Sequence, residues 1–236
     1  MASTARKESK HPGSVGKPGL AAPLVFLLIY VVTLLGGPMV LAFMPGLGKD
    51  ASTYYTIGFY CSLALLGFFM FRRDLLDDFK EFARHPVKLL IVGVLGFAVI
   101  KGTNTLVDFL VQNVGVAQNQ KNAEEFLHKT LFAIPIVTLI GPFVEEVGFR
   151  HALIGRLKSR VPVAVLSVVS VVGFAVLHMG EPSMQALKPM LNYLVIGLVI
   201  TVAYLIFKKL SYALSIHVVN NIVGAALVLM QGPPSS

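Results

Sequence analysis

The sequence predicts an all-α, polytopic integral membrane protein: a bundle of about seven transmembrane helices (six to eight) with a cytoplasmic N-terminus. The first observation behind this is composition, because hydrophobic residues make up 55% of the 236 residues and charged residues only 14%. Soluble domains carry about 25% charged residues, and a chain with so few cannot cover its own surface in water. A soluble enzyme, an extracellular disulfide scaffold and a disordered regulator are therefore excluded.

The second observation is a series of seven apolar segments, each close to the roughly 20 residues that a helix needs to cross the hydrocarbon layer. No period of 20–50 residues recurs, so the segments form one bundle rather than a solenoid. The single cysteine, Cys61, lies in one of them and is expected to pack there. We expect the spans at residues 20–44, 52–71, 88–111, 128–150, 161–179, 189–207 and 211–230.

The third observation is the distribution of lysine and arginine. With the N-terminus inside, 14 of these residues fall in the inner segments and four in the outer ones, in agreement with the positive-inside rule. Topology therefore explains the net charge of +8, and we expect no nucleic-acid partner. The four outer residues are Lys49, Lys121, Lys129 and Lys188.

Three further segments flank or interrupt the bundle, which spans residues 20–230. Residues 1–19 are rich in Ser, Gly, Pro and Lys, which predicts a disordered basic cytoplasmic tail. Residues 231–236 form a short C-terminal tail. Residues 72–88 combine charges of both signs with apolar residues at helical spacing, which predicts an amphipathic helix at the inner interface.

Ionisable side chains interrupt the spans between residues 142 and 221, where each costs several kcal/mol and so indicates a functional interior. In span four, Glu146 and Arg150 are four residues apart on one helix face, which predicts a structural ion pair. Glu145 lies about 100° around the helix. Since it has no local counter-ion, it is a candidate general base.

Two further polar groups lie in spans five and seven. His178 is near the end of span five, and His217 and Asn221 share a face of span seven. An imidazole and an amide side by side can stabilise an oxyanion. Hydrogen bonding between helices is the alternative role, but the combination with Glu145 favours chemistry.

Taken in order on three membrane helices, Glu-Glu-x-x-x-Arg, Phe-x-x-x-His and His-x-x-x-Asn resemble the CPBP family. This family comprises CAAX-type prenyl-protein endopeptidases, bacteriocin-processing or immunity proteins and abortive-infection membrane proteins. The resemblance covers about residues 130–222. One position departs from it, because many bacterial members have glycine directly after the arginine, where this chain has His151. We interpret His151 as a bystander towards the inner interface.

The resemblance implies intramembrane proteolysis. In such a mechanism Glu145 activates the attacking water with help from His178, and His217 and Asn221 hold the tetrahedral oxyanion. Glu146 and Arg150 would support the site.

Family members are often labelled metalloproteases. A catalytic zinc usually has three protein ligands, and Glu145, His178 and His217 are the set that this chain offers. No two histidines are spaced to ligate from one helical turn, however, and the resemblance favours a metal-free, glutamate-activated water. We therefore expect no cofactor, with Zn²⁺ as the alternative.

The expected function is an intramembrane endopeptidase, in a bacterial plasma membrane, that cleaves a peptide or membrane-protein substrate near or within the inner leaflet. The alternative is a non-catalytic bacteriocin self-immunity or regulatory membrane protein that acts by binding. A transporter is disfavoured because no inverted repeat or pair of broken helices is found.

The expected depth of His178 in the membrane differs from that of Glu145. His178 is about 27 Å along span five from its inner end, at 1.5 Å per residue, whereas Glu145 is expected in the inner half of the membrane. The two meet only if span five tilts or starts within the cytoplasmic layer, or if span four extends past Arg150 into residues 151–160. We expect a cavity that opens towards the cytoplasm, with His178 as its least secure member.

A weaker polar cluster lies on one face of span three and contains Lys101, Asn104 and Asp108. Pairing across that face is the preferred interpretation, and a contribution to a substrate groove is the alternative. We interpret residues 118–122 and His128 as a solvated outer loop.

Overall fold

A computed structural model gives the fold of the chain, and over the residues that it describes the protein is all-helical, with no strand. This confirms the predicted fold class. Most of the two predicted tails lies outside the described residues. The described residues are 19–43, 50–112, 114–179, 184 and 186–232.

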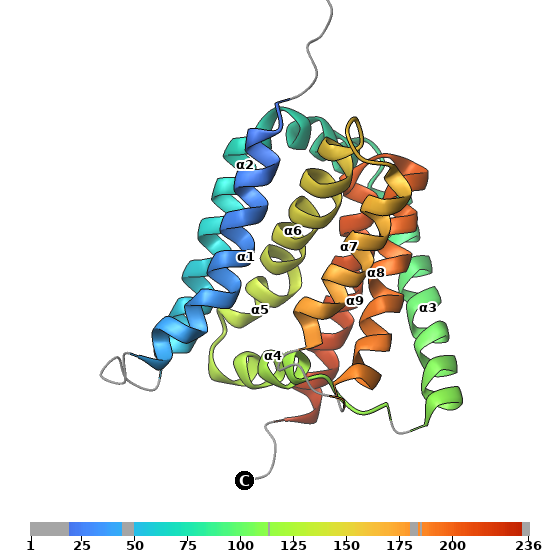
Figure 1. Ribbon diagram of the computed structural model, residues 1–236. Helices are drawn as coiled ribbons and strands as arrows, with labels where there is room; N and C mark the ends of the chain where they lie inside the picture. The colour runs from blue at the N-terminus through green and yellow to red at the C-terminus, as the bar shows by residue number, and fades with distance from the viewer. Residues whose placement is uncertain (1–18, 44–49, 113, 180–183, 185, 233–236) are drawn as a thin grey trace, which may run out of the picture.

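In this part of the chain, seven helical runs pass along the bundle in alternating directions, and one short helix, α4, lies across an end (Figure 1). The fourth run is a continuous helix in which α-helical and π-helical stretches alternate. The elements are α1 (Ala21–Ala42), α2 (Ala51–Arg84), α3 (Pro86–Val111), α4 (Gln118–Lys129), α5 (Ala133–Pro135), η2 (Ile136–Ile140), α6 (Gly141–Glu146), η3 (Val147–Arg156), α7 (Val163–Met179), α8 (Leu187–Phe207) and α9 (Leu210–Gln231).

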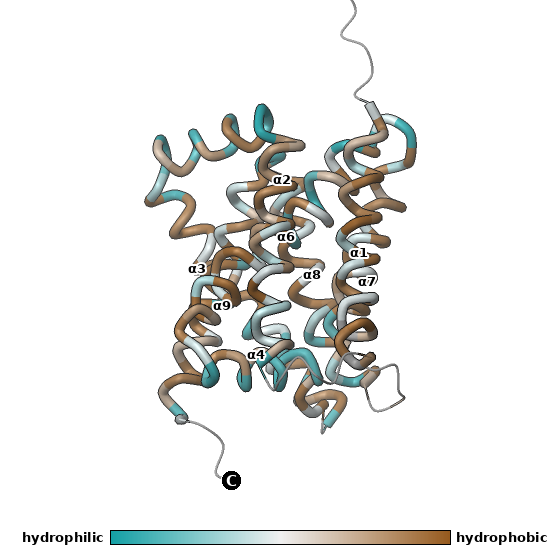
Figure 2. Tube along the Cα trace, turned by 90° about the vertical axis from the view of Figure 1, so that its left-hand side faces the viewer, coloured by the Kyte–Doolittle hydropathy of each residue, from teal (hydrophilic) through white to brown (hydrophobic). Residues whose placement is uncertain are grey.

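Five of these helices, α1, α2, α3, α8 and α9, are long and apolar enough to cross a membrane. The other two predicted spans correspond to α7, which has 17 residues, and to the run from α5 to η3. Figure 2 shows hydrophobic residues along the helices and hydrophilic residues gathered at the two ends of the bundle. The protein is therefore a multi-pass integral membrane protein with the predicted order of spans.

The sequence placed the start of span four too early and missed α4. The predicted span is 128–150, whereas the run begins at Ala133 and continues to Arg156. Residues 118–122 and His128 belong to α4 rather than to a loop. Its polar side chains bond one turn apart, as from Gln120 to Glu124 at 3.0 Å, and its buried Phe126 and Leu127 pack against α5, η2 and α9.

The predicted amphipathic segment is the last part of α2. The backbone departs from helical angles at Phe71 (φ −116°, ψ 16°), and the residues that follow cross the upper end of the bundle (Figure 1). On its inner face Leu75 is fully buried, whereas Leu76 is exposed. This segment brings charged groups to the ends of several other helices.

Aromatic side chains join α1, α2 and α7 to the central helix. The Tyr30 and Phe174 rings each meet the Phe149 ring edge to face, at centroid distances of 6.1 and 5.7 Å. On the other side, α3 lies close against α9 because Gly96 has no side chain; a Cβ there would be 2.6 Å from Ile216. Both contacts fix helices that carry predicted site residues.

Within the polar cluster of α3, Asp108 bonds to α8, and Lys101 contacts a ring of its own helix. The Asn192 amide donates to Asp108 Oδ1 at 3.4 Å. The Lys101 ammonium lies 5.7 Å from the centre of the Phe97 ring. This arrangement is a contact between helices and lies apart from the residues described next.

Candidate active site

The paired glutamates lie at the end of α6, between the π-helical stretches η2 and η3. Pro142 has no N–H to donate, and its ring crowds the carbonyl groups of the preceding turn. The helix is widened just before it, with the Gly141 N–H bonded to the Ile136 carbonyl five residues back. Such π-helical insertions occur frequently at functional sites.

Glu146 is fully buried and joins two helices. Its Oε1 accepts hydrogen bonds from Arg150 Nη1 at 3.0 Å and from His217 Nδ1 at 2.8 Å. Arg150, also fully buried, donates through Nη2 to the Gly197 carbonyl of α8 at 3.0 Å. The predicted ion pair is therefore present, and it links α6 and η3 to both α8 and α9.

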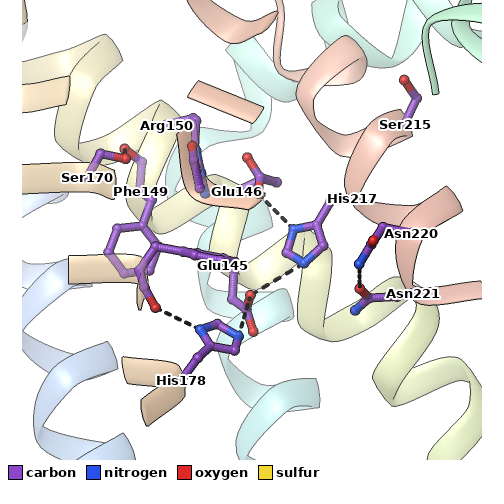
Figure 3. Close-up of polar contacts among 12 residues, drawn as sticks. Glu145, Glu146, Phe149, Arg150, Ser170, His178, Ser215, His217, Asn220 and Asn221 are labelled. Atoms are coloured by element: carbon purple, nitrogen blue, oxygen red, sulfur yellow. Dashed lines mark hydrogen bonds and ion pairs between the residues drawn. The ribbon is translucent and has the colours of Figure 1, made fainter. Parts of the chain in front are cut away.

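Glu145 faces both histidines (Figure 3). Its Oε2 lies 3.7 Å from His178 Nε2 and 3.7 Å from His217 Nε2. It is 6% exposed, and His217 is 3% exposed. The structure thus gathers Glu145, Glu146, Arg150, His178 and His217 at one buried position.

The tautomer of His178 follows from its neighbours. Its Nδ1 lies 2.7 Å from the Phe174 carbonyl, which can only accept, so Nδ1 carries a hydrogen. In the neutral ring Nε2 is then an acceptor directed at Glu145. The ring is fixed between those of Phe174 and Tyr193, with centroids at 4.4 and 4.6 Å.

His178 and Glu145 meet, although the spans predicted from the sequence place them at different depths. The helix continues past Arg150 as far as Arg156, so Glu145 lies deeper in the bundle than a span ending at Arg150 would allow. Extension through residues 151–156 is one of the arrangements that the sequence permitted. His151 is outside the site, as interpreted from the sequence, and its Nε2 lies 3.2 Å from Asp74 Oδ2.

Asn221 lies near the same position but is held differently. Its Nδ2 donates to the Val137 carbonyl in η2 at 2.9 Å. Its Oδ1 accepts from Asn220 Nδ2 at 3.2 Å. Asn221 thus ties α9 to the helix of the glutamates, and its role towards an oxyanion stays a prediction.

Two tyrosines of the site were missed by sequence reasoning. Tyr60 of α2 lies beside the Glu145 carboxylate, and Tyr193 of α8 stacks on His178. Each lies in an apolar span without a spacing pattern to a charged residue. They can be identified as site residues only from the way α2 and α8 pack against the central helix.

The site buries two carboxylates and one guanidinium, so it has one uncompensated negative charge unless it holds a further proton. Over the described residues, no group of three His, Cys, Asp or Glu side chains is arranged to hold a metal ion. The two histidine Nε2 atoms approach Glu145 without forming such a group.

Residues 127–223 match a family model described as Type II CAAX prenyl endopeptidase Rce1-like. The match covers about two fifths of the chain and contains all six predicted site residues. Comparison with the curated proteins and with the solved structures gave no match.

Proposed function

Since residues 127–223 belong to the Rce1-like family of CAAX prenyl endopeptidases, we propose that the protein is an intramembrane endopeptidase. It hydrolyses a peptide bond of a membrane-associated peptide or protein, near or within the inner leaflet of a bacterial plasma membrane. Its catalytic residues are Glu145, His178, His217 and Asn221, and Glu146 and Arg150 support them.

The observation that carries this proposal is the convergence of two imidazoles on one carboxylate. His178 Nε2 and His217 Nε2 are both 3.7 Å from Glu145 Oε2. This distance is too long for direct hydrogen bonds. It suits groups that act together on a small molecule such as water.

In the first step Glu145 takes a proton from the water as its oxygen attacks the carbonyl carbon of the substrate. His178 orients the water, because its Nδ1–H is bonded to the Phe174 carbonyl and its Nε2 is left as an acceptor. The carbonyl oxygen becomes an oxyanion. When the C–N bond breaks, Glu145 returns its proton to the leaving nitrogen.

His217 stabilises the oxyanion in this scheme. A hydrogen on its Nε2 would be the donor to the oxyanion. The Glu146 carboxylate holds the other ring nitrogen, at 2.8 Å from Nδ1, and so fixes the ring. Asn221, one turn further along α9, would supply the second donor through the Nδ2 hydrogen that is not bonded to the Val137 carbonyl.

No step of this mechanism passes through a metal ion. Glu145, His178 and His217 stay the alternative ligand set if a zinc ion is bound. Glu145 has no cationic partner in its own helix, so its carboxylate can take the proton of the water. In this scheme the water is therefore activated without a Lewis acid.

The test compares new protein and peptide termini by mass spectrometry in cells that express wild type or Glu145→Gln at equal membrane abundance. Glu125→Gln is the matched control, because Glu125 is an exposed residue of α4 that pairs with Lys129. Termini that require Glu145 but not Glu125 would establish proteolysis and identify the substrate. Equal termini in all three would favour an immunity or regulatory protein that acts by binding.

A further inference from the structure

Three acidic residues of α2 contact two of the three helices that carry the site, η3 and α9. Asp74, Asp78 and Glu81 lie beyond the kink at Phe71, spaced by four and three residues, so they share one face of the helix. We call this face, Asp74, Asp78 and Glu81, the acidic clasp. It lies outside residues 127–223.

One side of the clasp binds the end of the glutamate helix. Asp74 Oδ2 forms an ion pair with Arg156 Nη2 at 2.6 Å and lies 3.2 Å from His151 Nε2. The Phe71 ring meets the His151 ring edge to face, at a centroid distance of 4.9 Å. The last two turns of η3 are therefore held against α2.

The other side binds the beginning of α9, which has no side-chain cap and no acidic residue of its own in its first turn. Asp78 Oδ1 accepts the Leu210 N–H at 3.1 Å. A carboxylate at this position satisfies a free N–H and meets the positive end of the helix dipole. Glu81 Oε1 accepts from the Tyr212 hydroxyl at 2.7 Å.

Both contacts lie within a few turns of the site. Glu145 and Glu146 lie about three turns from Arg156, and His217 lies about two turns from Leu210. The axial position of α9 relative to η3 therefore decides whether His217 lies between the two carboxylates. A shift of about 1 Å in such a site can cost about 100-fold in rate.

We propose that the acidic clasp positions η3 and α9, which carry the glutamate pair's arginine and His217, relative to one another, with Asp78 as its principal residue. This inference rests on the proposed function for its effect on cleavage, but not for its effect on helix position. Asp78 touches neither substrate nor reacting atoms, so it is a positioning residue.

Asp77 provides a matched control on the same helix. It pairs with Lys80 at 2.6 Å, and both side chains are largely exposed, at 65% and 59%. Asp77→Ala removes a carboxylate one position away without touching α9. Asp78→Asn is the conservative variant, because its side-chain oxygen can still accept the Leu210 N–H.

The experiment measures helix position and catalysis in the same full-length variants. Spin labels on Lys158→Cys and Lys208→Cys, in a Cys61→Ser background, report the distance between the end of η3 and the beginning of α9 by pulsed electron double resonance. We expect Asp78→Ala to shift or broaden this distance and to lower kcat about tenfold with little change in KM. Asp78→Asn should restore both, and Asp77→Ala should change neither.

An unchanged distance in Asp78→Ala would overturn the inference, whether or not kcat falls. A shifted distance with unchanged kcat would also overturn it, because the clasp would then not position the site. If wild type cleaves no substrate, the proposed function fails, and the distance measurement alone still decides whether the clasp sets the helix position.

Discussion

Replacement of Glu146 by glutamine is expected to lower both stability and cleavage, whereas Glu145→Gln is expected to abolish cleavage alone. Glu146 is fully buried and accepts hydrogen bonds from Arg150 and His217. A neutral amide leaves the buried guanidinium without its counter-charge, and breaking a buried ion pair costs about 3–5 kcal/mol. Total stabilities are about 5–15 kcal/mol, so a large fraction is lost.

Glu145 should behave differently because no cation lies beside it in its own helix, and its Oε2 accepts no hydrogen bond from the described residues. Glu145→Gln should therefore change stability by less than about 1 kcal/mol. Two measurements test this prediction. The first is the midpoint of thermal unfolding in detergent, monitored by size-exclusion chromatography of heated samples. The second is cleavage of the identified substrate.

A compensating variant separates the two roles of Glu146. In Glu146→Gln/Arg150→Met neither charge remains, so part of the lost stability should return while cleavage stays low. A Glu146→Gln protein that is as stable as wild type yet inert would refute the reasoning and reassign the base to Glu146.

Three further outcomes follow from the structure. Gly96→Ala should lower stability by about 1–3 kcal/mol, because a Cβ there would lie 2.6 Å from Ile216. The control is Gly102→Ala, on the same helix with open space around it, which should be neutral or stabilising in the same thermal assay. His217→Ala should remove cleavage and leave the protein in the membrane; full activity would contradict its assigned role. Treatment with 1,10-phenanthroline should leave cleavage unchanged, and loss of activity restored by Zn²⁺ would instead make Glu145, His178 and His217 metal ligands.

The parts of the fold that depend on local spacing could be predicted from the sequence. The ion pair of Glu146 with Arg150 requires only that residues four apart share a helix face. The spans follow from the length and apolarity of each segment, and the structure agrees with most of their ends within a few residues. Residues 1–18 of the predicted tail at 1–19 lie outside the described residues.

The parts that depend on packing between helices could not be predicted. The sequence does not say that the helix of Glu145 continues to Arg156, and this extension is what brings His178 within 3.7 Å. Polar residues dominate the sequence of α4 and suggest a loop. The burial of Phe126 and Leu127 against neighbouring helices makes this segment a helix instead. Tyr60 belongs to the site only through the position of α2.

The two glutamates show how stability and chemistry are divided between neighbouring residues. Glu146 binds a guanidinium of its own helix and an imidazole of α9, so its charge is satisfied by two fixed partners. Glu145, one position along, faces two imidazoles at 3.7 Å and lacks such a partner. An unsatisfied buried carboxylate is costly. The strongly bonded Glu146 holds His217 and Arg150 in place around it, which allows the bundle to retain a carboxylate that is free to act as a base.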